Sequence, residues 1–167
     1  VHIMQALLQA IETMAWPTDA QRIFHGRGGM YPGCEHWTLD AYPPVFLLTS
    51  FQAVSDADVE TVRAALTARL AQLAPGQALN LVFQHRDEVR ADTLLVAGNV
   101  PDPHEVTELG AKYRVHLLRA MNHGLFLDMA EGRRWVADFV AARSRVKVLI
   151  LFAYTCAFSV VAMKAGA

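Results

Sequence analysis

The strongest constraint on the fold is a run of 16 residues without a charged side chain, from Val148 to Met163. A helix that crosses a membrane needs about 20 apolar residues. This run is shorter, and three hydroxyl-bearing residues interrupt it. The pattern therefore favours a buried strand followed by a buried helix over a membrane anchor. Val146–Phe152 is nearly all β-branched or aliphatic, as expected for a parallel strand covered on both faces.

Helical patterns flank this predicted strand. Glu131–Ala142 carries apolar residues on one side, and Phe158–Lys164 returns to helical spacing. Helix, buried strand, tight turn and helix is the order in which a doubly wound, Rossmann-like sheet begins. Ligands in such sheets bind beyond the carboxyl ends of strands, where amides at a helix start are available. Ala153–Ser159 is therefore a candidate ligand loop, although many strand–turn–helix units share its small residues.

The first hundred residues predict a separate α+β module. Ser55 and Asp58 have the spacing of a helix N-terminal cap, and an apolar stripe then continues until Pro75-Gly76. Two extended runs precede this helix and two follow it, at His36–Tyr42, Val45–Phe51, Leu79–Gln84 and Thr93–Ala97. The order strand, strand, helix, strand, strand indicates a compact β-β-α-β-β-like domain.

These elements divide the chain into three expected parts. A helix with apolar positions from Ile3 to Met14 occupies residues 1–21, and the small α+β domain covers residues 22–103. Asp102-Pro103 is typical of a linker. The start of a Rossmann-like domain then covers residues 104–167, entered through a hairpin that turns at Gly110.

Composition limits the partners and the compartment. The formal net charge is −1, which argues against a strongly basic nucleic-acid binder, but residues 109–147 hold eight basic and three acidic side chains. That segment predicts either a local basic surface for a polyanion or an ordinary solvated face. The two cysteines form no disulfide framework and no metal-ligand spacing, which indicates a reduced, cytoplasmic setting without a metal.

A second candidate site is the segment from Asn122 to Met129, which places an amide, a glycine, an aromatic ring and a carboxylate close together. This composition suits a polar ligand with a flat ring, or else a plain turn with Asp128 as a helix cap. Upstream, His25, Arg27 and His36 are candidate phosphate contacts, although isolated loop residues of this kind are usually solvated.

Three segments together resemble a known family. "NHGLFLDMAEGRRWV" and "VLILFAYTCAFSVVAMKAGA" are similar to the paired motifs of the S-adenosylmethionine-dependent methyltransferases related to the bacterial large-subunit 23S rRNA enzymes. "FHGRGGMYPGCEHWTLDAYPPVFLL" resembles the start of the small domain of that family. The resemblance runs from about Arg22 to the last residue, and it departs from the family pattern at Met121, Ile150 and Ala157.

The resemblance implies a function and a set of cofactor contacts. S-adenosyl-L-methionine would donate a methyl group to a nucleophile, with RNA as the expected substrate and rRNA as its expected kind. The residues that match the family's cofactor-binding positions are Asn122, Phe126, Asp128, Phe152, Ala153, Tyr154, Thr155 and Ser159.

The resemblance also leads us to expect an N-terminal fragment, inactive by itself, whose catalytic residues lie outside this sequence. Two alternatives remain at this stage. One is a non-catalytic module for binding nucleic acid or protein, and the other is a membrane anchor formed by the uncharged run.

Overall fold

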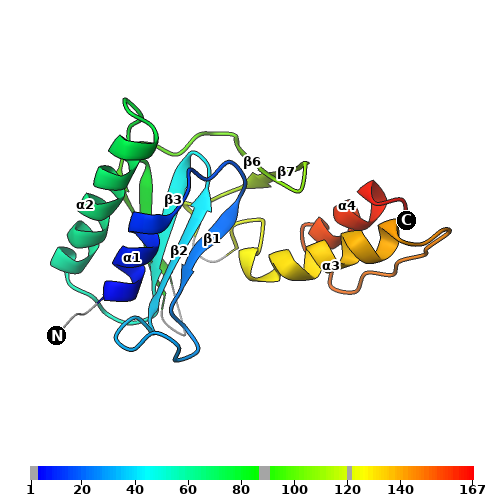
Figure 1. The fold of residues 1–167 in the computed structure, drawn as a ribbon, viewed down its shortest axis with the longest axis horizontal. Helices are drawn as coiled ribbons and strands as arrows, with labels where there is room; N and C mark the ends of the chain where they lie inside the picture. The colour runs from blue at the N-terminus through cyan, green and yellow to red at the C-terminus, as the bar shows by residue number, and fades with distance from the viewer. Residues whose placement is uncertain (1–3, 87–90, 120–121) are drawn as a thin grey trace.

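The computed structural model describes residues 4–86, 91–119 and 122–167, and its main body is a five-stranded sheet (Figure 1). The strands lie in the order β1–β2–β3–β4–β5, and each neighbouring pair is antiparallel except β3 with β4. They span β1 Gln21–His25, β2 Trp37–Tyr42, β3 Val45–Ser50, β4 Leu81–Arg86 and β5 Ala91–Ala97. Helix α2 (Asp56–Leu73) makes the crossover between the two parallel strands, and α1 (Gln5–Thr13) lies beside it.

Side-chain alternation along the central strands gives the sheet two different faces. Trp37, Leu39 and Ala41 of β2 point into the core that α1 and α2 cover. The intervening residues of β2 are Thr38, Asp40 and Tyr42, and they face the other way. Every residue of β2 and of β3 is buried. Polar side chains are therefore buried on the second face, which also carries the candidate site.

The start of α2 confirms the predicted cap. The Ser55 hydroxyl accepts a hydrogen bond from the backbone N–H of Asp58 at 3.2 Å, and the Asp58 carboxylate accepts one from the backbone N–H of Ser55 at 3.0 Å. This reciprocal pair satisfies two amides that the first helical turn leaves without partners.

Replacing Ser55 by Ala should lower the free energy of unfolding by about 1 kcal/mol, because the first turn loses one side of this cap. Urea denaturation monitored by circular dichroism measures the change. Thr67→Ala is the matched control, since it removes an exposed hydroxyl from the middle of the same helix. Equal effects of the two substitutions would contradict the role of the cap.

The remaining elements cover the second face and extend away from it (Figure 1). Strands β6 (His104–Glu108) and β7 (Ala111–Val115) form a hairpin, as the turn at Gly110 predicted. A 3-10 turn, η1 (Leu127–Met129), leads into α3 (Ala130–Ala141), and α4 (Ala157–Lys164) packs against α3. Apolar residues of the sheet, the hairpin and α4 share one core on the second face, so this core is continuous across residue 103.

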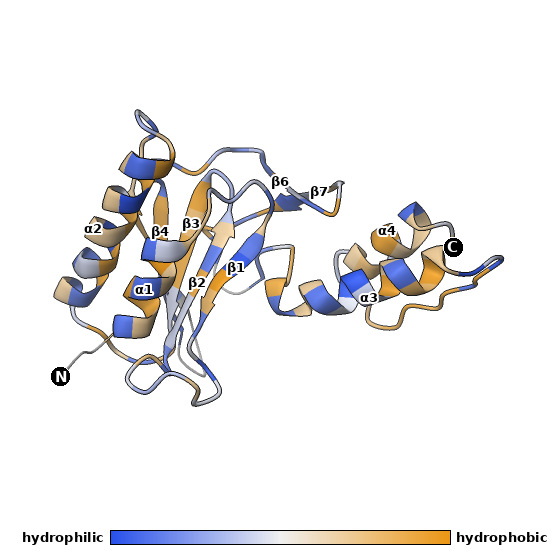
Figure 2. Cartoon of the chain, viewed as in Figure 1, coloured by the Kyte–Doolittle hydropathy of each residue, from blue (hydrophilic) through white to orange (hydrophobic). Residues whose placement is uncertain are grey.

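The predicted buried strand at Val146–Phe152 is wrong for this structure. The segment is an irregular coil, Leu149 is 84% exposed, and Phe152 is fully exposed. Figure 2 shows the apolar colouring of this coil beside the α3–α4 pair. A parallel strand is held by hydrogen bonds to neighbouring strands. None of the described residues forms a ladder with this segment, so its β-branched sequence does not become a strand.

The class of the fold is confirmed as mixed α and β. Elements β2, β3, α2, β4 and β5 follow in the expected order, but the sheet has an additional strand, β1, that the sequence analysis did not predict. Residues 104–167 supply a hairpin and helices, and the described part of this region contains no parallel pair of strands. No helix among the described residues has the length and apolarity needed to cross a membrane.

Candidate functional site

The two segments that the sequence singled out lie against each other. The backbone N–H of Gly124 donates to the Tyr154 hydroxyl at 3.2 Å, and the Thr155 hydroxyl donates to the Gly124 carbonyl at 2.6 Å. The rings of Phe126 and Tyr154 stack with centroids 4.8 Å apart. Residues about thirty positions apart in the chain thus form one small aromatic and hydrogen-bonded contact.

The loop before α4 reaches this contact through unusual backbone conformations. Phe152, Tyr154 and Cys156 have φ of 55°, 50° and 61°, in the left-handed region that residues other than glycine adopt rarely. Ala157 instead begins α4 and is not among the residues of positive φ. The position where the family has a glycine therefore accepts alanine here without backbone strain. Met121, another departure from the family, lies outside the described residues.

The predicted cofactor residues do not all meet. Phe126 and Asp128 line the same cavity, whereas Phe152 points into solvent and Ser159 lines a separate groove between α4 and residues 146–150. Asn122 is exposed, and Ala153 is half-buried. The structure thus brings together Phe126, Tyr154 and Thr155 around Gly124. Asp128 follows Phe126 by two residues in the chain.

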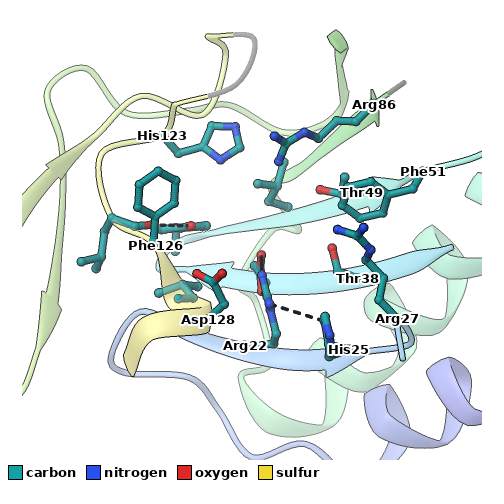
Figure 3. Close-up of a pocket in the computed structure, with 15 residues that line it drawn as sticks. Arg22, His25, Arg27, Thr38, Thr49, Phe51, Arg86, His123, Phe126 and Asp128 are labelled. Atoms are coloured by element: carbon teal, nitrogen blue, oxygen red, sulfur yellow. Dashed lines mark hydrogen bonds and ion pairs between the residues drawn. The ribbon is translucent and has the colours of Figure 1, made fainter. Parts of the chain in front are cut away.

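A cavity of about 400 Å³ lies next to this contact, on the second face of the sheet (Figure 3). Residues of β2 and β3 form its floor, because alternation turns Thr38, Asp40, Leu47 and Thr49 to that side. The other lining residues come from β1 and the loop after it, from the last residue of β2, from Phe51, from the end of β4, and from residues 123–128. They are Arg22, His25, Arg27, Tyr42, Phe51, Arg86, His123, Leu125, Phe126, Leu127 and Asp128.

One ion pair is built into the wall of the cavity. The guanidinium of Arg22 donates to both carboxylate oxygens of Asp40, at 2.8 and 3.2 Å, in a bidentate arrangement. Burial raises the pKa of Asp40, and the charge and hydrogen bonds of Arg22 oppose that rise. Arg22 also lies 3.4 Å from Nδ1 of His25. Burial and the charges of Arg22 and Arg27 lower the pKa of His25.

Among the histidines that line the cavity, His123 has the most strongly shifted pKa. Its Nε2 lies 3.4 Å from the side-chain amide of the buried Gln84, and its ring is edge-on to Tyr42. Burial, with a smaller contribution from the charge of Arg86, lowers the pKa of His123 from 6.5 to about 4. The imidazole is therefore neutral at pH 7.

The folded state should lose stability in acid through His123. Between pH 6.5 and 4 the unfolded chain binds a proton at this imidazole and the folded chain does not. The contribution is complete above pH 6.5 and falls by about 3 kcal/mol as the pH decreases to 4. Urea denaturation of the wild type and of His123→Gln across this range measures it. We expect the variant to show the smaller loss between pH 7 and 4, and an identical slope would contradict the assignment.

Several basic side chains of residues 109–147 have acidic partners. Arg133 is buried in a pair with Glu108, and Arg134 pairs with Glu131 on the surface. Arg114 lies 3.7 Å from Glu105 across the hairpin. Among the described residues, the cavity lining contains three arginines and two carboxylates.

Sequence reasoning found part of this lining and missed the rest. His25 and Arg27, considered as phosphate contacts, do line the cavity, whereas His36 packs beside Trp37. Arg22 and Arg86 were not considered, because no local motif joins residues of β1 and β4. The available signal was the polar Thr38 and Asp40 in a strand that is otherwise apolar, which indicates a face with buried polar partners.

The sequence of this chain is similar to those of known methyltransferases. The family model described as S-adenosylmethionine-dependent methyltransferase matches residues 21–167. The ribosomal RNA large subunit methyltransferase I of Pseudoalteromonas atlantica is 27% identical over 130 residues, which are 78% of this chain and 32% of that protein. Its counterpart from Shewanella amazonensis is 28% identical over 131 residues, with the same two coverages.

Two solved structures have a similar fold. The crystal structure of SMU.776, described as a methyltransferase complexed with SAH, is 28% identical with a TM-score of 0.63, covering 90% of this chain and 36% of that one. A structure described as a SAM-dependent methyltransferase from Streptococcus mutans has a TM-score of 0.68 at 23% identity, covering 100% of this chain and 44% of that one. The second likeness concerns the fold alone.

The chain belongs to the S-adenosylmethionine-dependent methyltransferase family, since the family model covers most of it. This confirms the resemblance found in the sequence, and the predicted cofactor is the one that the family's description names. The chain spans about a third of the length of the curated relatives it matches. Among the residues that the structure describes, no group of three His, Cys, Asp or Glu side chains could hold a metal ion.

Proposed function

We propose that this chain forms the substrate-side domain and the first cofactor-binding elements of a methyltransferase that acts on RNA, with rRNA of the large ribosomal subunit as the expected substrate. The observation that carries the proposal is the contact of Phe126 with Tyr154, tied together through both backbone groups of Gly124 and adjacent to the cavity. Because the curated relatives are named for this RNA, their names support the substrate class.

The residues at this contact suit the proposed donor. S-adenosylmethionine supplies a methyl group already activated by a sulfonium, so the task of the protein is mainly to orient it. Phe126 and Tyr154 are both about half exposed and offer flat surfaces to a purine ring. The exposed carboxylate of Asp128 carries the charge that an ammonium or sulfonium group requires.

We also propose that three parts of the chain have different roles. Residues 22–103 would face the RNA, and residues 104–167 would begin the cofactor-binding part, with residues 1–21 covering the sheet through α1. The core shared across residue 103 supports a fixed orientation of the two parts, because a packed interior does not deform continuously.

Methyl transfer can be tested with the purified full-length methyltransferase of which this chain would form a part, supplied with S-adenosylmethionine that carries a labelled methyl group. We expect label in large-subunit rRNA and none in small-subunit rRNA from the same preparation. Transfer to protein or to small-subunit rRNA alone would contradict the proposed substrate. A non-catalytic binding module, the alternative, would bind RNA without consuming the donor.

Replacing Phe126 by Ala should weaken binding of the demethylated product, S-adenosylhomocysteine, by about tenfold. Loss of a stacking ring removes on the order of 1–1.5 kcal/mol. Isothermal titration calorimetry of wild type and variant measures the change. Phe139→Ala is the matched control, since Phe139 is an exposed aromatic residue of α3 that stacks on Trp135 outside the site. Equal weakening by both substitutions would contradict the role of Phe126.

A further inference from the structure

The backbone of the loop at residues 152–156 has an unfavourable conformation at every second position. Phe152, Tyr154 and Cys156 all have positive φ. A side chain with a Cβ atom disfavours this left-handed region, because the Cβ then lies too close to the backbone. A loop that keeps such a conformation at three of its five positions depends on contacts that hold it there.

Three contacts tie this loop to residues 124–126. The Tyr154 hydroxyl accepts a hydrogen bond from the backbone N–H of Gly124, and the Thr155 hydroxyl donates to the carbonyl of the same residue. The Tyr154 ring also stacks on Phe126, with 27° between the ring planes. Four of the five loop residues are exposed and Ala153 is half-buried, so burial contributes little. The contacts favour the closed loop, whereas its backbone conformation opposes it.

We propose that residues 152–156 form a strap, which opens by releasing Gly124 and Phe126 before the methyl donor enters and thereby limits the rate of donor binding. This inference rests on the proposed function and deepens it, because the same loop would bind the donor. The Tyr154 ring covers one face of Phe126. A flat ring can therefore reach that face only after Tyr154 has moved away from it.

The surroundings of the strap allow it to move while its partner stays in place. The strap follows the exposed coil at residues 149–151 and ends at Ala157, which is buried at the start of α4. Gly124 lies directly on β7, because an added Cβ there would be 2.6 Å from the carbonyl oxygen of Arg114. The strap can thus swing on its two ends without disturbing the core or the segment that it contacts.

The test follows the binding of S-adenosylhomocysteine by stopped-flow fluorescence in the full-length protein of which this chain would form a part. If the strap must open first, the observed rate reaches a plateau at high ligand concentration, and the plateau equals the rate of opening. Tyr154→Phe keeps the ring but removes the hydroxyl that accepts from Gly124. We expect the plateau to rise about fivefold, as the loss of one hydrogen bond predicts. Tyr31→Phe is the matched control, because Tyr31 contacts Phe24 instead, and it should leave the plateau unchanged.

A pair of variants at Phe152 tests the contribution of the backbone alone. The side chain is fully exposed, so Phe152→Ala and Phe152→Gly both remove the same unburied ring. Only glycine adopts positive φ without steric cost. Phe152→Gly should therefore favour the closed strap and lower the plateau about fivefold relative to Phe152→Ala.

The outcomes separate the strap from the proposed function. A rate that rises linearly with ligand concentration, or equal plateaus for Tyr154→Phe and Phe152→Gly, would overturn the strap and leave the proposed function intact. Absence of binding by the wild type would contradict the proposed function, and the strap would then be tested by relaxation dispersion of the Phe126 and Tyr154 rings in the protein alone. Exchange between two environments, with the minor one more populated in Tyr154→Phe at the remaining Phe126 probe, supports the strap, and a single environment overturns it. Thermal unfolding shows that each variant is folded.

Discussion

Replacing Arg133 by Met is expected to lower the free energy of unfolding by about 4 kcal/mol. The guanidinium of Arg133 is 1% exposed and donates to both oxygens of Glu108, at 2.5 and 2.7 Å. Glu108 is itself buried at the end of β6, so the substitution leaves a carboxylate without its partner inside the protein. Because Arg133 belongs to α3, the pair joins the hairpin to the helical part.

The control for this prediction lies on the same helix. Arg134 pairs with Glu131 at the surface, where both side chains are mostly exposed, so Arg134→Met should cost less than about 1 kcal/mol. A double variant, Glu108→Leu with Arg133→Met, should recover much of the loss, since it leaves no buried charge without a partner. Urea denaturation compares all three. Equal losses for Arg133→Met and Arg134→Met would show that the buried pair contributes no more to stability than the surface pair.

Replacing Gly124 by Ala is expected to cost about 4 kcal/mol and to separate the two segments of the candidate site. The residue has φ of +107°, which L-amino acids rarely adopt, and an added Cβ would lie 2.6 Å from the backbone carbonyl oxygen of Arg114. Strain of this kind costs on the order of 1–3 kcal/mol, and overpacking against fixed backbone costs a similar amount. Relief of the overlap would move the Gly124 groups that bond to Tyr154 and Thr155.

Gly28→Ala separates the cost of backbone strain from the cost of the steric overlap. Gly28 has almost the same φ, +105°, but an added Cβ would meet nothing within 4 Å. We therefore expect it to cost only the conformational part, on the order of 2 kcal/mol. Chemical denaturation measures both variants, and the near-ultraviolet circular dichroism of the aromatic residues reports on the Phe126–Tyr154 contact. If the two substitutions had the same effect, the close approach of Gly124 to β7 would be unimportant.

Elements whose signals are local could be predicted from the sequence. Helix α2 carries its own start in Ser55 and Asp58, and the strands on either side of it carry β-branched and aromatic runs. The tandem family motifs predicted that Phe126 and Tyr154 belong to one cofactor site, but their stacking on each other was not predicted, since neither segment indicates the other by its composition.

Features that depend on distant partners could not be predicted in this way. Val146–Phe152 has the composition of a buried strand, yet a strand forms only where another strand pairs with it. β1 was missed because its short run from Gln21 to His25 contains three polar residues and two apolar ones. The cavity lining was missed for a related reason, as Arg22 and Arg86 are brought together by the order of strands in the sheet.

We propose that the loop before α4 and the segment around Phe126 bind the methyl donor together. The most direct measurement follows the aromatic side-chain resonances in carbon–proton NMR spectra while S-adenosylhomocysteine is added to millimolar concentration. We predict saturable shifts of the Phe126 and Tyr154 rings, with the ring of Phe139 unchanged as an internal reference. Unchanged Phe126 and Tyr154 signals throughout the titration would contradict the account.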